Sequence, residues 1–279
     1  MAGTASGRPA RTRRSTGAST LTPVSGLGLG VAMIWFSLLV LVPLSAVVVK
    51  STGAGWSGFW DTVTNDQTAA AIRLTVGFAL LVTAVNVVMG TLIAWVLVRD
   101  QFFGKRFLEV LIDIPFALPT IVAGLVLLSL YGADSPLGVD IANQRSAVFV
   151  AFLFVTLPFV VRMVQPVLEE LDRDVEEAAA SLGASRFTTF RRIVLPSLTP
   201  AIAAGAALSF ARAVSEYGSL VLLSGNLPFK TEVTSVRILS SIENDQLPQA
   251  TAVATVLLAI SLVVIVLVDV AQRRISGRG

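Results

Sequence analysis

The sequence predicts an all-α protein that crosses a membrane six times. Hydrophobic residues make up 54% of its 279 residues and charged residues only 14%, whereas a soluble domain carries about 25% charged residues. Mean hydropathy is correspondingly high, at +0.79. A spanning helix needs about 20 apolar residues to cross about 30 Å of hydrocarbon. Six such runs occur, at roughly 27–49, 71–98, 111–131, 146–166, 195–224 and 250–270.

The first apolar run, GLGLGVAMIWFSLLVLVPLSAVVV, is longer than the 7–15 residue core of a signal peptide. We therefore expect it to be retained as a membrane span. Residues 1–26, which precede it, are rich in Gly, Ser, Thr and Arg, a composition that predicts a disordered cationic cytoplasmic tail. Residues 271–279 are expected to form a second cytoplasmic tail, and residues 27–270 the transmembrane domain.

The third span contains Pro115 and Pro119. Proline lacks a backbone donor, so both residues predict a bend whose freed carbonyls are satisfied by protein or by a water-lined cavity. Asp113 precedes them. Two interpretations stay open: a flexible gate segment of a translocation path, or an ordinary kinked helix with Asp113 at the membrane interface.

The fifth span carries two charged residues, Arg212 and Glu216. Each costs about 2.5–3.5 kcal/mol to insert at a helix centre, so a compensating contact is expected. Residues four apart share one helix face and can pair. The pair is either part of a gate or translocation path, or a static ion pair that fixes helix packing. Small residues in the same span favour close helix packing: Gly205, Ala206, Ala207, Ser209, Ala211 and Ala213.

Lys and Arg placement predicts the orientation, because basic loops stay on the cytoplasmic side. One side of the membrane would hold fifteen basic residues: Arg8, Arg11, Arg13, Arg14, Arg99, Lys105, Arg106, Arg162, Arg173, Arg186, Arg191, Arg192, Arg273, Arg274 and Arg278. The other side would hold five: Lys50, Arg73, Arg145, Lys230 and Arg237. Both termini are therefore expected in the cytoplasm.

Composition also argues against several function classes. The chain has no cysteine and no histidine, which removes the commonest catalytic and metal-binding groups, so we expect no catalytic residue, metal or cofactor. Net charge is only +3, and basic loops beside spans explain it without nucleic acid. No G-x-x-x-x-G-K-[ST] phosphate loop occurs. The nearest segment, 225–231, lacks the second glycine, so ATP would have to be hydrolysed by another chain.

One polar stretch interrupts this apolar chain: EEAAASLGASRFTTFRRIVLP, residues 176–196. Its strong helix formers end at Gly183, a residue suited to a left-handed helix C-terminus. Phe187, Phe190 and Ile193 then recur at helical spacing. The segment from about 168 to 194 therefore predicts a helix-turn-helix under the membrane. Its acidic first part suits the positive helix N-terminus. The second helix is expected to run into the fifth span, although Pro196 is a residue type that stops helices.

This stretch resembles the signature loop of ABC importer permeases, EAA, three residues, G, nine residues, I-x-L-P. The matching residues are Glu177, Ala178, Ala179, Gly183, Ile193, Leu195 and Pro196. The resemblance implies a type I ABC importer permease fold in a bacterial inner membrane, with this loop coupling the chain to a separate ATPase subunit. The alternative is an Ala-rich interfacial helix of no special role.

Further segments resemble the sulfate and thiosulfate permeases, their T-type subunit in particular: GTLIAWVLVRD, DIPFALPTIVAGLVL, TLPFVVRMVQPVL and ARAVSEYGSLVLLSGNLPFKTE. The resemblance implies three partners besides membrane lipid: ATPase subunits, a sister W-type permease and an extracytoplasmic sulfate-binding protein. Ser215 departs from the family pattern, where a glycine is common. A molybdate/tungstate permease is the alternative, because it shares the Pro-x-x-Leu-Pro element, but it usually lacks a comparable first helix.

Overall fold

The computed structural model describes residues 23–276. It divides into two units, residues 1–46 and 47–279, and each is described by itself. The first unit contains α1 (Pro23–Phe36), a π-helical turn η1 (Ser37–Leu41) and the start of α2 (Val42–Ser51), which continues into the second unit. The helix begins at Pro23, so residues 23–26, expected in the tail, are helical. The rest of the predicted tail, residues 1–22, lies outside the described residues.

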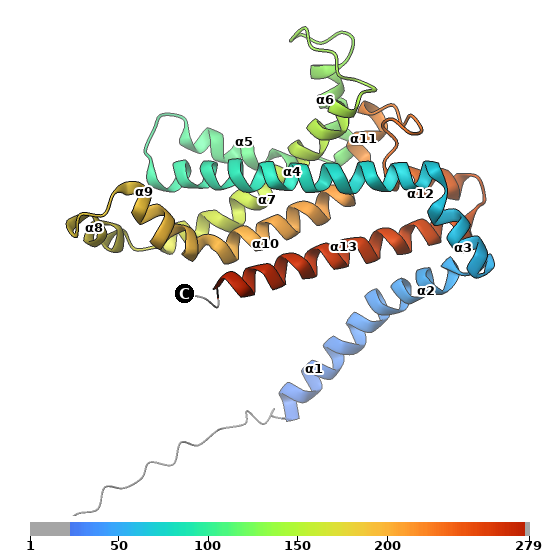
Figure 1. Cartoon of the computed structure of the whole chain (residues 1–279), viewed down its shortest axis with the longest axis horizontal. Helices are drawn as coiled ribbons and strands as arrows, with labels where there is room; N and C mark the ends of the chain where they lie inside the picture. The colour runs from blue at the N-terminus through green and yellow to red at the C-terminus, as the bar shows by residue number, and fades with distance from the viewer. Residues whose placement is uncertain (1–22, 277–279) are drawn as a thin grey trace, which may run out of the picture. The chain divides into compact units, whose positions relative to one another are not determined.

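The second unit is built from helices, and no strand occurs among the residues that the structure describes. In chain order (Figure 1) they are α3 (Gly55–Thr64), α4 (Asp66–Arg99), α5 (Lys105–Ala117), α6 (Thr120–Tyr131), α7 (Arg145–Glu170), α8 (Arg173–Ser181), α9 (Arg186–Thr189), the π-helical turn η2 (Phe190–Val194), α10 (Leu195–Val214), α11 (Gly218–Leu223), α12 (Thr234–Glu243) and α13 (Leu247–Ser276).

Within residues 23–276, five helices are long and apolar enough to cross a membrane, and one bent pair makes six when it is counted as a span. That pair, α5 and α6, is the predicted third span, and its halves are bent by 118°, which confirms the bend expected from the two prolines. The break lies at Leu118 and Pro119. Leu118 has extended dihedrals, φ −86° and ψ 134°, as expected for a residue before proline. Pro115 lies inside α5 without ending it.

The fifth span also differs from its predicted limits. It runs without a break from Arg186 to Val214, so it starts inside the predicted polar loop and ends ten residues before the expected boundary. The chain leaves the helix at Ser215 and resumes at Gly218 as α11. At the other end of the chain, α13 runs to Ser276, so most of the predicted C-terminal tail is helical and only 277–279 lie outside the described residues.

The core of the second unit is the packing of α4, α7 and α10. Val160 of α7, itself fully buried, lies between two glycines. A Cβ atom on Gly90 of α4 would come within 2.8 Å of the Val160 Cβ, and one on Gly205 of α10 within 2.9 Å of the Val160 Cα. Small residues let helix backbones approach this closely in membranes, so close packing at Gly205 is confirmed.

A buried polar contact joins the same three helices, and the sequence analysis did not predict it. The Asn86 side-chain amide donates to Thr156 Oγ1 at 2.7 Å and to Ser209 Oγ at 3.3 Å. All three residues are fully buried. Interhelical hydrogen bonds of this kind contribute about 0.6–2 kcal/mol in membranes. Ser209 therefore does more than allow close packing, and Asn86 in the apolar run FALLVTAVNVVMG was the signal for it.

Two short helices, α6 and α11, follow the two breaks and contact each other through their backbones. A Cβ atom on Gly124 would come within 2.8 Å of the Ser219 Cα, and one on Gly218 within 2.9 Å of the Ile121 backbone nitrogen. No larger residue fits at either glycine without separating the helices. We expect α6 and α11 to move as one body when the breaks flex.

Candidate functional site

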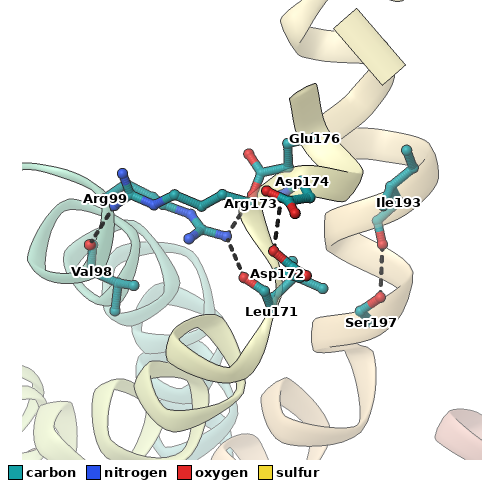
Figure 2. Close-up of polar contacts among 9 residues, drawn as sticks. All are labelled: Val98, Arg99, Leu171, Asp172, Arg173, Asp174, Glu176, Ile193 and Ser197. Carbon is teal, nitrogen blue, oxygen red and sulfur yellow. Dashed lines mark hydrogen bonds and ion pairs between the residues drawn. The ribbon is translucent and has the colours of Figure 1, made fainter. Parts of the chain in front are cut away.

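The first half of the polar loop is a short helix with defined ends. Asp172 Oδ1 accepts a hydrogen bond from the Asp174 backbone N–H at 3.0 Å and so caps the start of α8 (Figure 2). At the other end Gly183 has φ +82°. The Ala184 N–H donates to the Ala179 carbonyl at 3.0 Å, and the Gly183 N–H to Ala180 at 2.9 Å. These are the two bonds of a Schellman motif, which confirms the predicted left-handed glycine.

The second half of the loop runs directly into the fifth span. Ser185 caps α9, since its hydroxyl accepts from the Thr188 N–H at 3.2 Å. The second helix runs into the fifth span, as predicted, and Pro196 does not stop it. Proline cannot donate to the carbonyl four residues before it, and the preceding turn widens to π-helix instead: the Leu195 N–H donates to Phe190 five residues back. The second half of the loop and the span are thus one continuous helix.

Arg99, at the end of α4, anchors this loop to the bundle. Its Nη2 donates to Glu176 Oε1 of α8 at 2.5 Å and to the Leu171 carbonyl at 3.3 Å (Figure 2). Only 12% of the Arg99 side chain and 24% of the Glu176 side chain are exposed. Arg173 adds a hydrogen bond to the Val98 carbonyl at 3.4 Å. The contacts connect the first helix of the loop to α4.

Trp95, one turn before Arg99, contacts the second helix of the loop. Its ring meets the Phe190 ring edge to face, with centroids 5.5 Å apart. The Arg99 guanidinium also lies over Trp95, 5.8 Å from the ring centroid, within the range of a cation–π contact. The end of α4 therefore contacts both α8 and η2. Arg99 joins residues 77 positions away in the sequence, and the sequence analysis did not predict this contact.

The two faces of α8 differ in their surroundings. Toward the bundle, a cleft of about 390 Å³ is lined by Glu176, Glu177 and Ala180 of α8, together with Arg99, Arg173 and Arg186. The opposite face carries residues spaced i, i+3, i+4 and i+7, which places them on one helical stripe: Val175, Ala178, Ala179 and Leu182. Leu182 is 89% exposed and Val175 45%. Exposed apolar side chains grouped in this way mark an interaction surface, here called the outer face of α8.

The structure places Arg212 and Glu216 at the break between α10 and α11. Arg212 Nη1 lies 2.6 Å from Glu216 Oε2, so the predicted pair forms. The prediction that both residues share one helix face is wrong, because α10 ends at Val214. Glu216 is fully buried at its side chain, and its Oε1 accepts hydrogen bonds from the backbone N–H and the hydroxyl of Ser219, both at 2.9 Å. Glu216 thereby caps the start of α11.

Asp113 is paired as well. Arg162 of α7 donates from Nε to Asp113 Oδ1 at 2.7 Å and from Nη2 to Asp113 Oδ2. A third bond runs from Arg162 Nη2 to the Glu109 carbonyl at 3.2 Å. This two-point contact of a guanidinium with a carboxylate is geometrically specific. It fixes α5 to α7 beside the 118° bend, where Pro115 lies within α5 and Pro119 caps α6. The sequence analysis had placed Arg162 in the basic loops without a partner.

Five helices long and apolar enough to cross a membrane, one bent pair and an exposed helix-turn-helix between two of these helices are the parts expected of a membrane permease. The family described as "Binding-protein-dependent transport system inner membrane component" matches residues 86–278, more than half of the chain. The chain belongs to this family.

Several relatives are similar over most of their length. Sulfate transport system permease proteins CysT from Synechocystis sp., Salmonella typhimurium and Escherichia coli are 45%, 42% and 41% identical to it, over 87%, 90% and 90% of this chain and 87%, 94% and 94% of their own. A bacterial ABC transporter that imports alginate superimposes with a TM-score of 0.76 at 17% identity, covering 91% of this chain and 96% of the other. These likenesses confirm the predicted ABC importer permease fold.

Proposed function

We propose that the chain is the transmembrane permease subunit of an ATP-driven sulfate or thiosulfate importer, and that its 168–194 loop couples it to a separate ATPase. The observation that carries the coupling is the geometry of α8: one side is tied to α4 through Arg99, and the other has an apolar stripe whose Val175 and Leu182 no residue among 23–276 covers. The relatives named as sulfate permeases support sulfate over the molybdate/tungstate alternative.

In this proposal an ATPase subunit binds the outer face of α8 and moves it. The Arg99–Glu176 contact transmits the displacement to α4, and the unbroken helix from Arg186 to Val214 transmits it to α10. Bistable packed elements turn such small shifts into a change between inward-open and outward-open states. Ile193, Leu195 and Pro196 lie where the loop helix joins α10. Their role in this proposal is to keep that helix continuous.

The complete transporter would contain two ATPase subunits, a sister W-type permease and an extracytoplasmic sulfate-binding protein. The lack of a phosphate loop in the sequence supports a separate ATPase. The excess of Lys and Arg at the loop end of the bundle supports cytoplasmic termini and an α8 on the cytoplasmic side. The chain itself would supply half of the translocation path and none of the hydrolytic chemistry.

We also infer that the α6–α11 pair is the moving part of the gate. Both breaks that flank it carry an ion pair, Asp113–Arg162 before α6 and Arg212–Glu216 before α11. Guanidinium groups beside the path would attract a divalent oxyanion, and their carboxylate partners would hold them in place.

Glu216→Gln tests this gate. The amide keeps the shape and the hydrogen bonds to Ser219 but leaves Arg212 without its counter-charge, and a one-sided loss in a buried pair is costly. We expect sulfate uptake per permease molecule to fall about tenfold or more, measured against the amount of chain in the membrane. Asp269→Asn, which breaks an exposed pair with Arg273, serves as the control. Loss of chain from the membrane with unchanged uptake per molecule would assign the pair to packing alone.

The function itself is tested by uptake of radiolabelled sulfate in cells that lack this chain, with and without its return on a plasmid. Uptake that depends on the chain and is not suppressed by equimolar molybdate is the expected result. Suppression by molybdate in preference to thiosulfate would support the molybdate permease instead, and uptake independent of the chain would refute the proposal.

A further inference from the structure

A polar cavity of about 310 Å³ lies at the end of the second unit opposite the α8 loop. The two ends are joined by α4, whose 34 residues span about 50 Å at 1.5 Å per residue; Figure 1 shows α3 and α12 at one end and α8 and α9 at the other. The cavity lies among α3, the start of α4, α12 and the start of α13. Its polar lining residues are Asp61, Thr62, Asn65, Thr68, Arg237 and Gln249.

Two of these lining groups are buried without a partner. Thr68 is 1% exposed, and its hydroxyl makes no hydrogen bond among the described residues. The Nε of Arg237 is likewise buried and unbonded, and Arg237 forms no ion pair with any carboxylate that the structure describes. Arg237 as a whole is half-buried. Buried polar atoms in native proteins almost always have a partner. No residue among 23–276 supplies these partners, so a molecule in the cavity is left to supply them.

The remaining lining groups favour a negatively charged partner. The cavity is next to the N-terminus of α4, the positive end of a long helix. Gln249 and the free amide of Asn65 can donate; the Asn65 carbonyl oxygen is already used by the N–H groups of Gln67 and Thr68, at 3.0 and 3.3 Å. Asp61, which is exposed, is the single carboxylate among the lining residues. Donors thus outnumber acceptors around one unpaired guanidinium.

We propose that this cavity binds a small tetrahedral oxyanion, held by the Arg237 guanidinium, the Thr68 hydroxyl and the Gln249 amide. Naming the anion as sulfate rests on the proposed function, since the cavity would then lie on the external side from which sulfate arrives. A volume of about 310 Å³ leaves room for the anion and several waters, because one water takes about 30 Å³. Asp61 weakens binding by like charge and keeps the anion exchangeable.

Thiol protection measures this binding directly, because the chain has no cysteine of its own. Ala54→Cys places one thiol at the cavity wall, on an exposed residue whose side chain has no polar atom that could bind the anion. The assembled transporter, in lipid nanodiscs without ATP, is treated with a neutral maleimide in rising sulfate, with chloride at matched ionic strength as reference. We expect sulfate, and not chloride, to slow labelling of this chain.

Variants in the Ala54→Cys background identify the ligands. Arg237→Gln should raise the half-protecting sulfate concentration about tenfold or more, because charge-assisted hydrogen bonds are the strong ones. Thr68→Val, which keeps the shape and removes the hydroxyl, should raise it several-fold, in the range of about one lost hydrogen bond. Asp61→Asn should lower it. Arg73→Gln is the matched control, an exposed arginine near the same end of α4 but outside the cavity, and should change nothing.

Three results would overturn the proposal. Chloride could protect the thiol as well as sulfate does, sulfate could give no protection, or protection could be unaffected by Arg237→Gln and Thr68→Val. Weaker protection after Asp61→Asn would do the same, since it indicates a cation. Protection by phosphate but not by sulfate would refute the sulfate assignment. Sulfate uptake is measured separately on the same variants: intact uptake without protection defeats this site alone, whereas protection without uptake by the parent chain defeats the proposed function.

Discussion

Gly183→Pro is expected to abolish sulfate uptake while the assembled transporter continues to hydrolyse ATP. Gly183 has φ +82°, and proline is fixed near −65°. Its N–H also donates to Ala180 in the Schellman motif that ends α8, and proline has no such donor. Proline therefore cannot form this Schellman motif, and the loss falls on the turn that positions the outer face of α8. We expect uptake to fall about a hundredfold in proteoliposomes, with ATP hydrolysis retained.

Gly104→Pro provides a matched control for that experiment. Gly104 also has a left-handed conformation, φ +87°, and open space around it, but it lies in the turn before α5 and not in the 168–194 loop. A similar local strain there should leave uptake and hydrolysis coupled. Normal uptake by Gly183→Pro, or an equal loss in both variants, would contradict the coupling role of the loop.

Glu177→Lys approaches the same loop from its bundle-facing side. Glu177 lines the cleft that already contains Arg99, Arg173 and Arg186. A lysine would turn a balancing charge into a fourth cation, and like charges at this distance repel. We expect the chain to reach the membrane and sulfate uptake to fall, because α8 would be pushed away from the cleft that it lines. Glu177 thus lies on the side of α8 that faces the cleft, whereas Ala178 and Ala179 lie on its outer face.

The second large effect is expected at the anchor. Arg99→Glu places a carboxylate against Glu176, and Glu176→Arg places two guanidinium groups together. Removing one partner from a buried pair costs about 3–5 kcal/mol, and the partial exposure of both side chains reduces this to about 1–3 kcal/mol. We expect each single variant to lower uptake about tenfold or more, because α8 would then move without carrying α4.

The double variant Arg99→Glu with Glu176→Arg separates the contact from the two side chains. Residues in direct contact show coupling energies of about 0.5–3 kcal/mol, so the exchanged pair should restore a measurable part of the uptake. Arg273→Glu with Asp269→Arg repeats the exchange at an exposed pair. Neither its single variants nor the double variant should change uptake appreciably. A double variant as inactive as the product of its single variants would refute transmission through this contact.

The features that the sequence predicted correctly are local. Each of these features depends on residues a few positions apart: the glycine turn, the capped short helix and the apolar spans. Composition and spacing are therefore enough to predict them. The length of an apolar run, by contrast, does not report where a helix ends. The fifth run continues apolar to residue 224, yet α10 ends at Val214, because Glu216 and Ser219 satisfy the backbone of a new helix start.

Two prolines had different outcomes: the bend predicted at Pro119 is present, whereas Pro196 does not stop its helix. Pro119 breaks the third span by 118° while Pro196 leaves its helix continuous. The difference lies in the preceding turn: extended at Leu118, widened to π-helix before Pro196. The anchors could not be predicted at all, since Arg99 and Glu176, or Asp113 and Arg162, come together only through tertiary packing.

The central claim is that the outer face of α8 binds the ATPase. Because the chain has no cysteine, single thiols can be placed on either face: Leu182→Cys on the outer face, Ala180→Cys in the cleft. Oxidative cross-linking to thiols placed along the surface of the ATPase subunit measures which face is in contact. The account predicts cross-links from position 182, sensitive to ATP, and none from position 180. Cross-links from 180 alone, or from neither position in a transporter that is active, would contradict it.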